Sequence, residues 1–146
     1  MLSSLFRRGE KQRAPLVLHF EWRSPPVARG YWAYDITITS DGAGEVVMWP
    51  DYPAANPRIW RRSFNVPSAH LEPLVAHAGA RKWRESNDYM VGGSSSLLEV
   101  VVSGRLVRIG SNVDASDREA AMWMHAVARA LVPERVLADM ERARSR

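Results

Sequence analysis

The chain contains no cysteine, and this absence excludes several kinds of chemistry. Without thiols there can be no disulfide framework, no zinc site with cysteine ligands and no thiol nucleophile. Long apolar runs are also missing, because serine and arginine interrupt the apolar residues Leu2, Leu5 and Phe6. Since neither a signal-peptide core nor a run of membrane-spanning length is present, we expect a cytoplasmic protein with no membrane span.

Lysine is scarce as well, because 18 of the 20 basic residues are arginine. The net charge of +4 invites a nucleic-acid partner, but the charge is unevenly distributed along the chain. Residues 1–13 carry a net +3 and residues 141–146 a net +2, which leaves residues 14–140 at −1. We therefore predict a mobile basic tail over residues 1–13, a single domain over residues 14–146, and no nucleic acid as the principal partner.

Recognisable catalytic motifs are absent too. The sequence has no Gly-x-Ser-x-Gly elbow, and the segment over residues 92–96 lacks the Gly-Lys-Ser/Thr ending of a phosphate-binding loop. His70 and His77 are seven residues apart, which on a regular helix separates them by about 10.5 Å, too far for one metal ion. The sequence therefore predicts no catalytic residues, no cofactor and no metal site.

Alternating apolar and polar residues predict four strands in the first half of the chain. The first strand shows the pattern most clearly, since Leu18, Phe20 and Trp22 alternate with polar neighbours. The predicted strands cover residues 16–23, 32–39, 45–49 and 59–66. Ser68 is a candidate cap for a following helix that ends at Gly79, although Pro73 moves its expected start toward His70.

The second half of the chain begins with a predicted hairpin. Two β-rich runs flank the pair Ser103-Gly104, a spacing typical of two antiparallel strands joined by a tight turn. Ser116 and Glu119 then have capping-box spacing, so a helix is expected from Asp117 onward. The predicted hairpin strands cover residues 97–102 and 105–109.

This second helix is expected to run to Leu131 and to pack through one face. The spacing of its apolar residues places Trp123 on that face, with a structural role. Pro133 ends the helix and starts a short C-terminal helix over residues 134–144. Together these elements predict an α+β fold, a two-layer sandwich of about six mostly antiparallel strands with two main helices on one face and a short C-terminal helix.

Tryptophan, tyrosine and arginine occur together in two segments, and these residue types dominate the energetics of protein interfaces. One segment is an irregular, proline-rich loop and the strand after it; the other follows the first predicted helix. The residues predicted to bind a protein partner are Trp49, Tyr52, Trp60, Arg61, Arg62, Arg81 and Arg84.

In its length, its lack of cysteine and signal peptide, and its predicted sheet-and-helix layout, the chain resembles the small cytoplasmic immunity proteins that neutralise bacterial polymorphic toxins. The resemblance is one of architecture and carries over no functional residue. It implies a non-enzymatic protein-binding domain, an immunity-type inhibitor that docks on a toxin. The oligomeric state is left open.

Two alternatives remain. A small-ligand-binding or hydrolytic domain would place His19 or His125 beside Asp35, or beside the loop of residues 94–96, in a pocket, because histidine is a suitable acid or base near neutral pH. A nucleic-acid binder would instead use the basic tails.

Overall fold

The computed structural model describes residues 14–25, 32–50, 58–84 and 94–145. The predicted basic tail and the side chain of Tyr52 lie outside the described residues. In the ranges described, none of the helices combines the length and the apolar character needed to cross a membrane.

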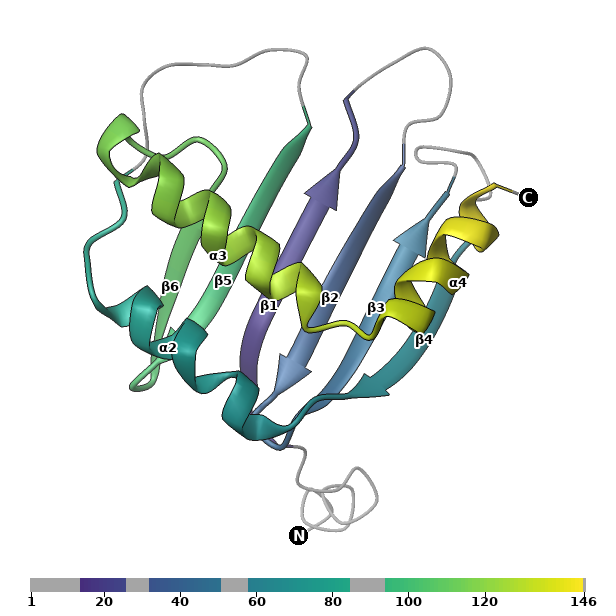
Figure 1. Ribbon diagram of the computed structural model, residues 1–146, viewed down its shortest axis with the longest axis horizontal. Coiled ribbons are helices and arrows are strands. Elements are labelled where there is room, and N and C mark those ends of the chain that lie inside the picture. Colours follow the sequence, from purple (N-terminus) through teal and green to yellow (C-terminus); the bar gives the residue numbers. More distant parts are fainter. Residues whose placement is uncertain (1–13, 26–31, 51–57, 85–93, 146) are drawn as a thin grey trace, which may run out of the picture.

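Six strands form one sheet, and every neighbouring pair is antiparallel. The order across the sheet is β4-β3-β2-β1-β5-β6, so the hairpin β5–β6 joins the first strand of the four-stranded meander (Figure 1). The strands are β1 (Leu16–Arg23), β2 (Ala33–Thr39), β3 (Ala43–Trp49), β4 (Trp60–Asn65), β5 (Ser95–Val102) and β6 (Arg105–Gly110).

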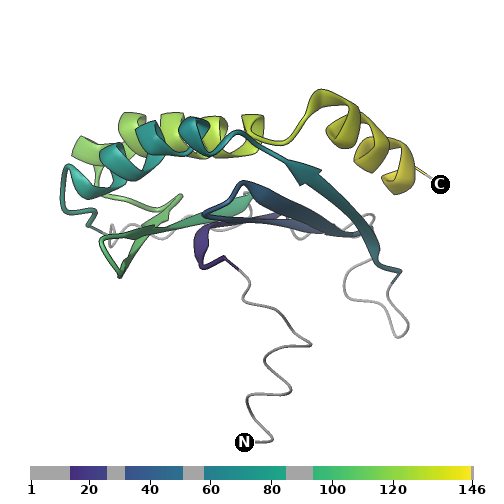
Figure 2. The same ribbon diagram turned by 90° about the horizontal axis from the view of Figure 1, so that it is seen from below.

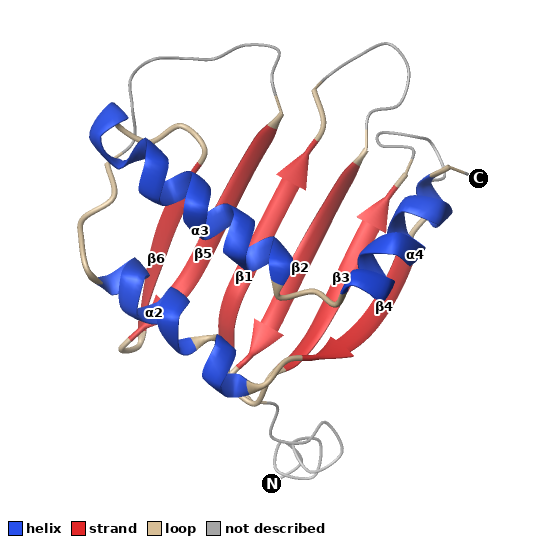
Figure 3. Cartoon of the chain, in the orientation of Figure 1, coloured by secondary structure: helices blue, strands red, loops and turns tan. Residues whose placement is uncertain are grey.

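The helices form a second layer on one face of the sheet (Figure 2). Helix α2 packs on β5 and β6, and α3 crosses the sheet over β5 and β1 toward β2 (Figure 3). Helix α4 lies over the other end of the sheet, against β4. The helical elements are η1 (Ser68–His70), α2 (Glu72–Gly79), η2 (Ala115–Asp117), α3 (Arg118–Ala130) and α4 (Glu134–Arg144). The predicted two-layer α+β fold is confirmed.

The core lies between the two layers. Alternate strand residues point toward the helices and are almost fully buried, as Ile36, Val46 and Leu98 show with no exposed area. Met124 and Ala128 of α3 complete this layer from the helix side. The opposite sheet face, which no described helix covers, is called the open face below.

The predicted tight turn of the hairpin is confirmed, whereas the predicted cap at Ser68 is not, because no side-chain hydrogen bond caps η1 or α2. Ser103 and Gly104 both adopt positive φ, at 50° and 78°, as a two-residue turn between twisted antiparallel strands requires. Pro73 lies in the first turn of α2, where its missing N–H costs no helical hydrogen bond, because the α-helix begins only after the short η1 turn.

Two details of α3 differ from the sequence prediction. The capping box does not form: Asp114 accepts from the backbone N–H of Ala115, and Ser116 donates to Asp114 at 3.4 Å. The packed face of α3 is shifted by one residue, so that Ala121 rather than the predicted Ala120 is buried.

The prediction that Trp123 has a core role is therefore wrong. Its side chain is 45% exposed and packs edge-on against His77 of α2, with ring centroids 4.8 Å apart. Small residues, Ala121 and Ala128, occupy the buried face instead and allow α3 to lie close to the sheet.

Candidate functional site

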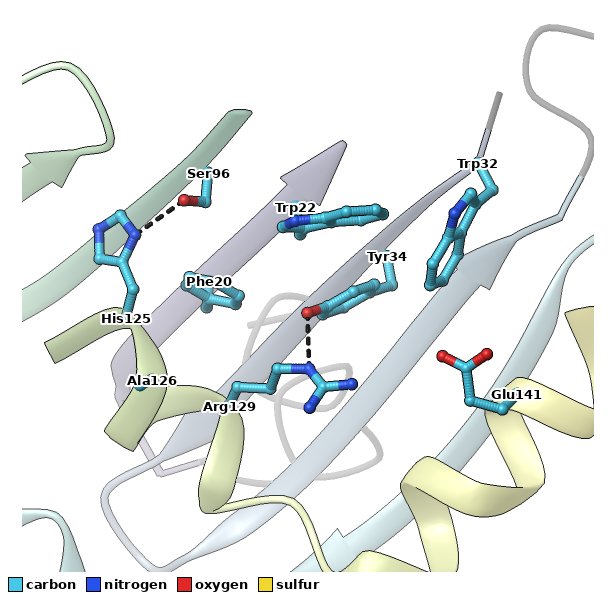
Figure 4. A pocket seen from close by; sticks show the side chains of 9 residues that line it. All are labelled: Phe20, Trp22, Trp32, Tyr34, Ser96, His125, Ala126, Arg129 and Glu141. Carbon is cyan, nitrogen blue, oxygen red and sulfur yellow. Dashed lines mark hydrogen bonds between the residues drawn. The ribbon is translucent and has the colours of Figure 1, made fainter. Parts of the chain in front are cut away.

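A cavity of about 320 Å³ lies on the helix-covered side of the sheet, between α3 and α4 (Figure 4). Strands β1 and β2 form its floor, the start of β5 borders it, and the two helices supply its charged residues. We call it the aromatic pocket. Its lining residues are Phe20, Trp22, Trp32, Tyr34, Ser96, His125, Ala126, Arg129 and Glu141.

Four aromatic side chains form one continuous wall of the pocket. Trp22 and Tyr34 face each other across the β1–β2 ladder, and their rings stack at 5.4 Å with an interplanar angle of 21°. The ring of Trp32 is tilted against that of Trp22 at 4.7 Å, and Phe20 contacts Tyr34 at 6.2 Å. Such mutual contacts fix the ring orientations and leave a rigid apolar surface.

Arg129 reaches this wall from α3. Its Nε donates a hydrogen bond of 3.0 Å to the Tyr34 hydroxyl, which orients the guanidinium (Figure 4). Burial raises the pKa of Tyr34, and the neighbouring Arg129 charge opposes that rise. Among the described residues, no carboxylate forms an ion pair with Arg129. With respect to the described residues, its terminal nitrogens are therefore available to an incoming group.

The other charges near the pocket are already matched. Arg144 pairs with Glu141 at 3.2 Å, and the Arg144 guanidinium lies 4.4 Å from the centre of the Trp32 ring. The Glu141 carboxylate is thereby compensated within α4, and a cation already covers one ring of the wall. The electrostatic balance of the pocket favours an anion at Arg129.

Ser96 and His125 close the end of the pocket nearest β5. Nε2 of His125 donates to the carbonyl oxygen of Ile109 at 2.7 Å, because a carbonyl can only accept. Nδ1 is then the acceptor for the Ser96 hydroxyl, 2.8 Å away. Burial lowers the pKa of His125, so the ring is neutral at pH 7.

The open face carries a different arrangement, which we call the histidine–carboxylate cluster. Here Nδ1 of His19 lies 2.8 Å from Glu99, and Nε2 lies 3.4 Å from Asp35. Hydrogen bonding to Asp35 and then to Glu99 outweighs the effect of burial and raises the pKa of His19 to about 9. The cluster comprises His19, Glu21, Arg23, Asp35, Glu99 and Arg108.

The two histidines of the ligand-binding alternative thus lie on opposite faces of the sheet. His125 contacts Ser96 in a pocket, as that alternative requires, whereas His19 contacts Asp35 on the open face. The combination of His125 with Asp35 does not form, because alternate residues of β2 point to opposite faces and Asp35 points away from α3.

The residues predicted to bind a protein partner do not form one surface. Trp49 and Arg61 lie on the open face, where Arg61 pairs with Glu45 at 3.3 Å. Trp60 and Arg62 lie on the helix-covered face, where Arg62 pairs with a residue of α4.

The remaining members lie at the other end of the molecule, because they follow α2, which packs on β5 and β6. Arg81 pairs there with Asp117 at 3.1 Å, and both Arg81 and Arg84 are exposed. Tyr52 lies outside the described residues, and the protein-binding role of the set stays a prediction.

The sequence interpretation missed the aromatic pocket, since it assigned Trp22, Trp32 and Tyr34 to ordinary strand packing. The alternation already placed these three aromatic residues on the same face of neighbouring strands, which is the available signal. The pattern could not show that Arg129 reaches this wall, because the position of Arg129 depends on how α3 is rotated over the sheet.

No known protein family matches the chain, and the curated proteins contain no match to it.

Proposed function

We propose that the protein binds a small aromatic carboxylate in the aromatic pocket. One observation carries this proposal: the guanidinium of Arg129, held by Tyr34, presents its terminal nitrogens to a cavity with an aromatic wall. The pocket supplies an apolar surface and one oriented cation, which together match a flat ring bearing an acid group.

The carboxylate preference follows from the shape and charge of Arg129. A guanidinium offers parallel N–H donors that fit the two oxygens of a carboxylate, and charge assistance makes such bonds stronger than neutral ones. Because Tyr34 already occupies Nε, the two terminal nitrogens are the groups available for this contact.

The aromatic part of the ligand would lie against the wall formed by Trp22, Trp32 and Tyr34. Aromatic rings gain from offset or edge contacts with other rings in addition to the area that they bury. The cavity volume of about 320 Å³ suits a single ring with a short side chain and lies at the lower end of small-molecule sites.

The test uses three probes that share a phenyl ring on a two-carbon chain and differ in the charged groups on that chain: 3-phenylpropionate carries a carboxylate, phenethylamine an ammonium group and phenylalanine both. We expect 3-phenylpropionate to bind at least about tenfold more tightly than phenethylamine, as measured by isothermal titration calorimetry on the full chain. Tighter binding of phenethylamine would show that Glu141 and the aromatic wall select cations, and it would overturn the proposal.

Arg129→Gln is the matched variant, and Arg135→Gln is its control. Arg129→Gln should weaken 3-phenylpropionate binding by about tenfold or more, because it replaces the charged guanidinium by a shorter, neutral polar side chain. Arg135 is exposed on α4 and does not line the pocket, so its variant should bind as the unaltered protein does. Equal losses in both variants would refute a specific role for Arg129.

Ser96 and His125 serve here as the polar end of the pocket. Both imidazole nitrogens of His125 are occupied, by Ser96 and by the Ile109 carbonyl, which fixes the ring and the adjacent wall.

The cytoplasmic location and the immunity-type docking on a toxin predicted from the sequence stay predictions. Co-purification of a stoichiometric protein partner from the native cell is the test of the docking prediction.

A further inference from the structure

The histidine–carboxylate cluster on the open face has the composition of a metal site. Nitrogen and oxygen donors of His19, Glu21 and Glu99 lie within 4.8 Å of one another. His19 and Glu21 are two residues apart on β1 and share a face, while Glu99 lies directly opposite His19 on β5. We propose that these three side chains bind one divalent transition-metal ion, for which Zn²⁺ is the best match.

The distances are close to those that zinc requires. Zn²⁺ binds imidazole nitrogen and carboxylate oxygen at about 2.0–2.2 Å in tetrahedral geometry, which places the ligand atoms roughly 3.3–3.6 Å apart. His19 Nδ1 and the Glu99 oxygen are now 2.8 Å apart, as expected for two groups that share a proton. Small rotations of the Glu21 and Glu99 side chains would bring the donor atoms of the three residues to the spacing that zinc requires.

The outer partners of the three ligands are also those of a metal site. Metal-binding histidines usually donate their second ring N–H to a carboxylate, and Nε2 of His19 points to Asp35 at 3.4 Å. Arg23 holds the Glu21 carboxylate at 2.8 Å, and Arg108 holds Glu99 at 3.3 Å. His19 and Glu21 are therefore each oriented by a further side chain, whereas the exposed Arg108 competes with a metal ion for Glu99.

A separate observation concerns the charge balance of the cluster, which requires a cation at the imidazole of His19. It contains three carboxylates but only two guanidinium groups, so a positive charge at the imidazole is needed for balance. Oδ1 of Asp35 is buried and has no hydrogen-bond partner in the described part of the chain, where Arg23 approaches it only to 3.9 Å. A metal ion at Nδ1 of His19 would supply that charge in place of a proton.

Three protein ligands leave the fourth position of a tetrahedral ion open, on a sheet face that no described helix covers. The site is separate from the aromatic pocket, because residues 19, 21 and 99 point to the face opposite to Phe20, Trp22 and Leu98. Failure of the metal proposal would therefore leave the proposed ligand-binding function intact.

The experiment is a calorimetric titration of the full chain with ZnCl₂ at pH 7.5. We expect one Zn²⁺ per chain, and we expect His19→Gln to weaken binding by at least about 100-fold because it removes the only nitrogen ligand. His70→Gln is the control, since His70 is exposed on η1 and lies outside the cluster. Absence of zinc binding to the unaltered chain, or equal binding by His19→Gln, overturns the proposal.

Two further variants keep the test decisive if His19→Gln fails to fold. Asp35→Asn should weaken zinc binding by about 10- to 100-fold, because it removes the carboxylate that orients the imidazole. Arg108→Gln should strengthen binding several-fold, because Arg108 is 63% exposed and competes with the metal for Glu99. A purely structural ion-pair network predicts neither change, so unchanged affinity in both variants also overturns the proposal.

Discussion

The two faces of the sheet shift the pKa of a histidine in opposite directions. His125, on α3, is surrounded by a hydroxyl, a backbone carbonyl and the edge of Phe20, and burial lowers its pKa. His19, on the open face, lies between Asp35 and Glu99, and its pKa rises to about 9. The same side chain is therefore neutral on one face and charged on the other at pH 7.

This difference shows how one sheet can support two kinds of site. On the helix-covered face, the aromatic rings of β1 and β2 and the helices above them favour neutral side chains and leave Arg129 as the oriented charge of the aromatic pocket. The open face has no such cover in the described part of the chain. Its strands instead place opposite charges on neighbouring residues.

The largest difference between the faces is expected from two neighbouring leucines of β5. Leu98 is fully buried beneath the helices, and Leu98→Ala should lower the free energy of unfolding by about 2–5 kcal/mol. Leu97 points to the open face and is only partly buried, so Leu97→Ala should cost about 1 kcal/mol. Urea denaturation measures both, and equal losses would contradict the assignment of the core to one face.

The second expected difference between the faces is the pH dependence of the free energy of unfolding. Because the pKa of His19 is raised from 6.5 to about 9, its stabilisation is fully present below pH 6.5 and is lost as the pH rises through 9. Allowing for solvent screening, the loss should be about 1–3 kcal/mol. The raised pKa of His19 arises first from Asp35, then from Glu99 and Glu21, and burial of the ring opposes them.

Urea denaturation at pH 6, 7.5 and 9.5 in the presence of a chelator measures this effect. The decline in the free energy of unfolding should disappear in His19→Gln, since glutamine does not titrate. His70→Gln, which alters an exposed histidine on η1, should retain it. A decline of the same size in His19→Gln would assign the titration to another group.

His125 should produce the opposite trend on the acid side. Its pKa is lowered in the folded protein, so the unfolded chain binds a proton more readily and stability falls as the pH drops below 6.5. His125→Gln should flatten the profile between pH 6.5 and 5. An unchanged acid slope in that variant would show that the slope comes from the carboxylates.

The smallest expected effect concerns Tyr34→Phe in the aromatic pocket. The change removes only the hydroxyl that accepts from Arg129, so stability should fall by about 1 kcal/mol or less. Affinity for 3-phenylpropionate should fall by about 3- to 10-fold, because the guanidinium loses its orientation. A loss of stability without any loss of affinity would mean that Tyr34 does not position Arg129.

Most of the fold could be predicted because it depends on local patterns. Alternation placed Phe20 and Trp22 on the covered face, and the pair Ser103-Gly104 specified the hairpin. The rotation of α3 was predicted with an error of one residue, because apolar spacing alone favoured Trp123 over Met124. Tryptophan proved better accommodated at the edge of the layer, against His77.

The sites were harder to predict, because each depends on contacts distant in sequence. Arg129 meets Tyr34 only because α3 crosses β2, and Glu99 meets His19 only because β5 pairs with β1 rather than with β4. Neither arrangement leaves a motif with fixed spacing in the sequence. The individual histidines were recognised as candidates, but their partners came from the sheet order.

The most direct measurement follows the six tryptophan indole N–H signals and the Arg129 Nε–H signal by NMR as 3-phenylpropionate is added. The indole signals of Trp22 and Trp32 and the Arg129 signal should shift together with one binding curve, because these groups line the aromatic pocket. Trp123, on the outer side of α3, and Trp83 should not shift. Shifts confined to Trp123, or no shifts at all, would contradict ligand binding at Arg129.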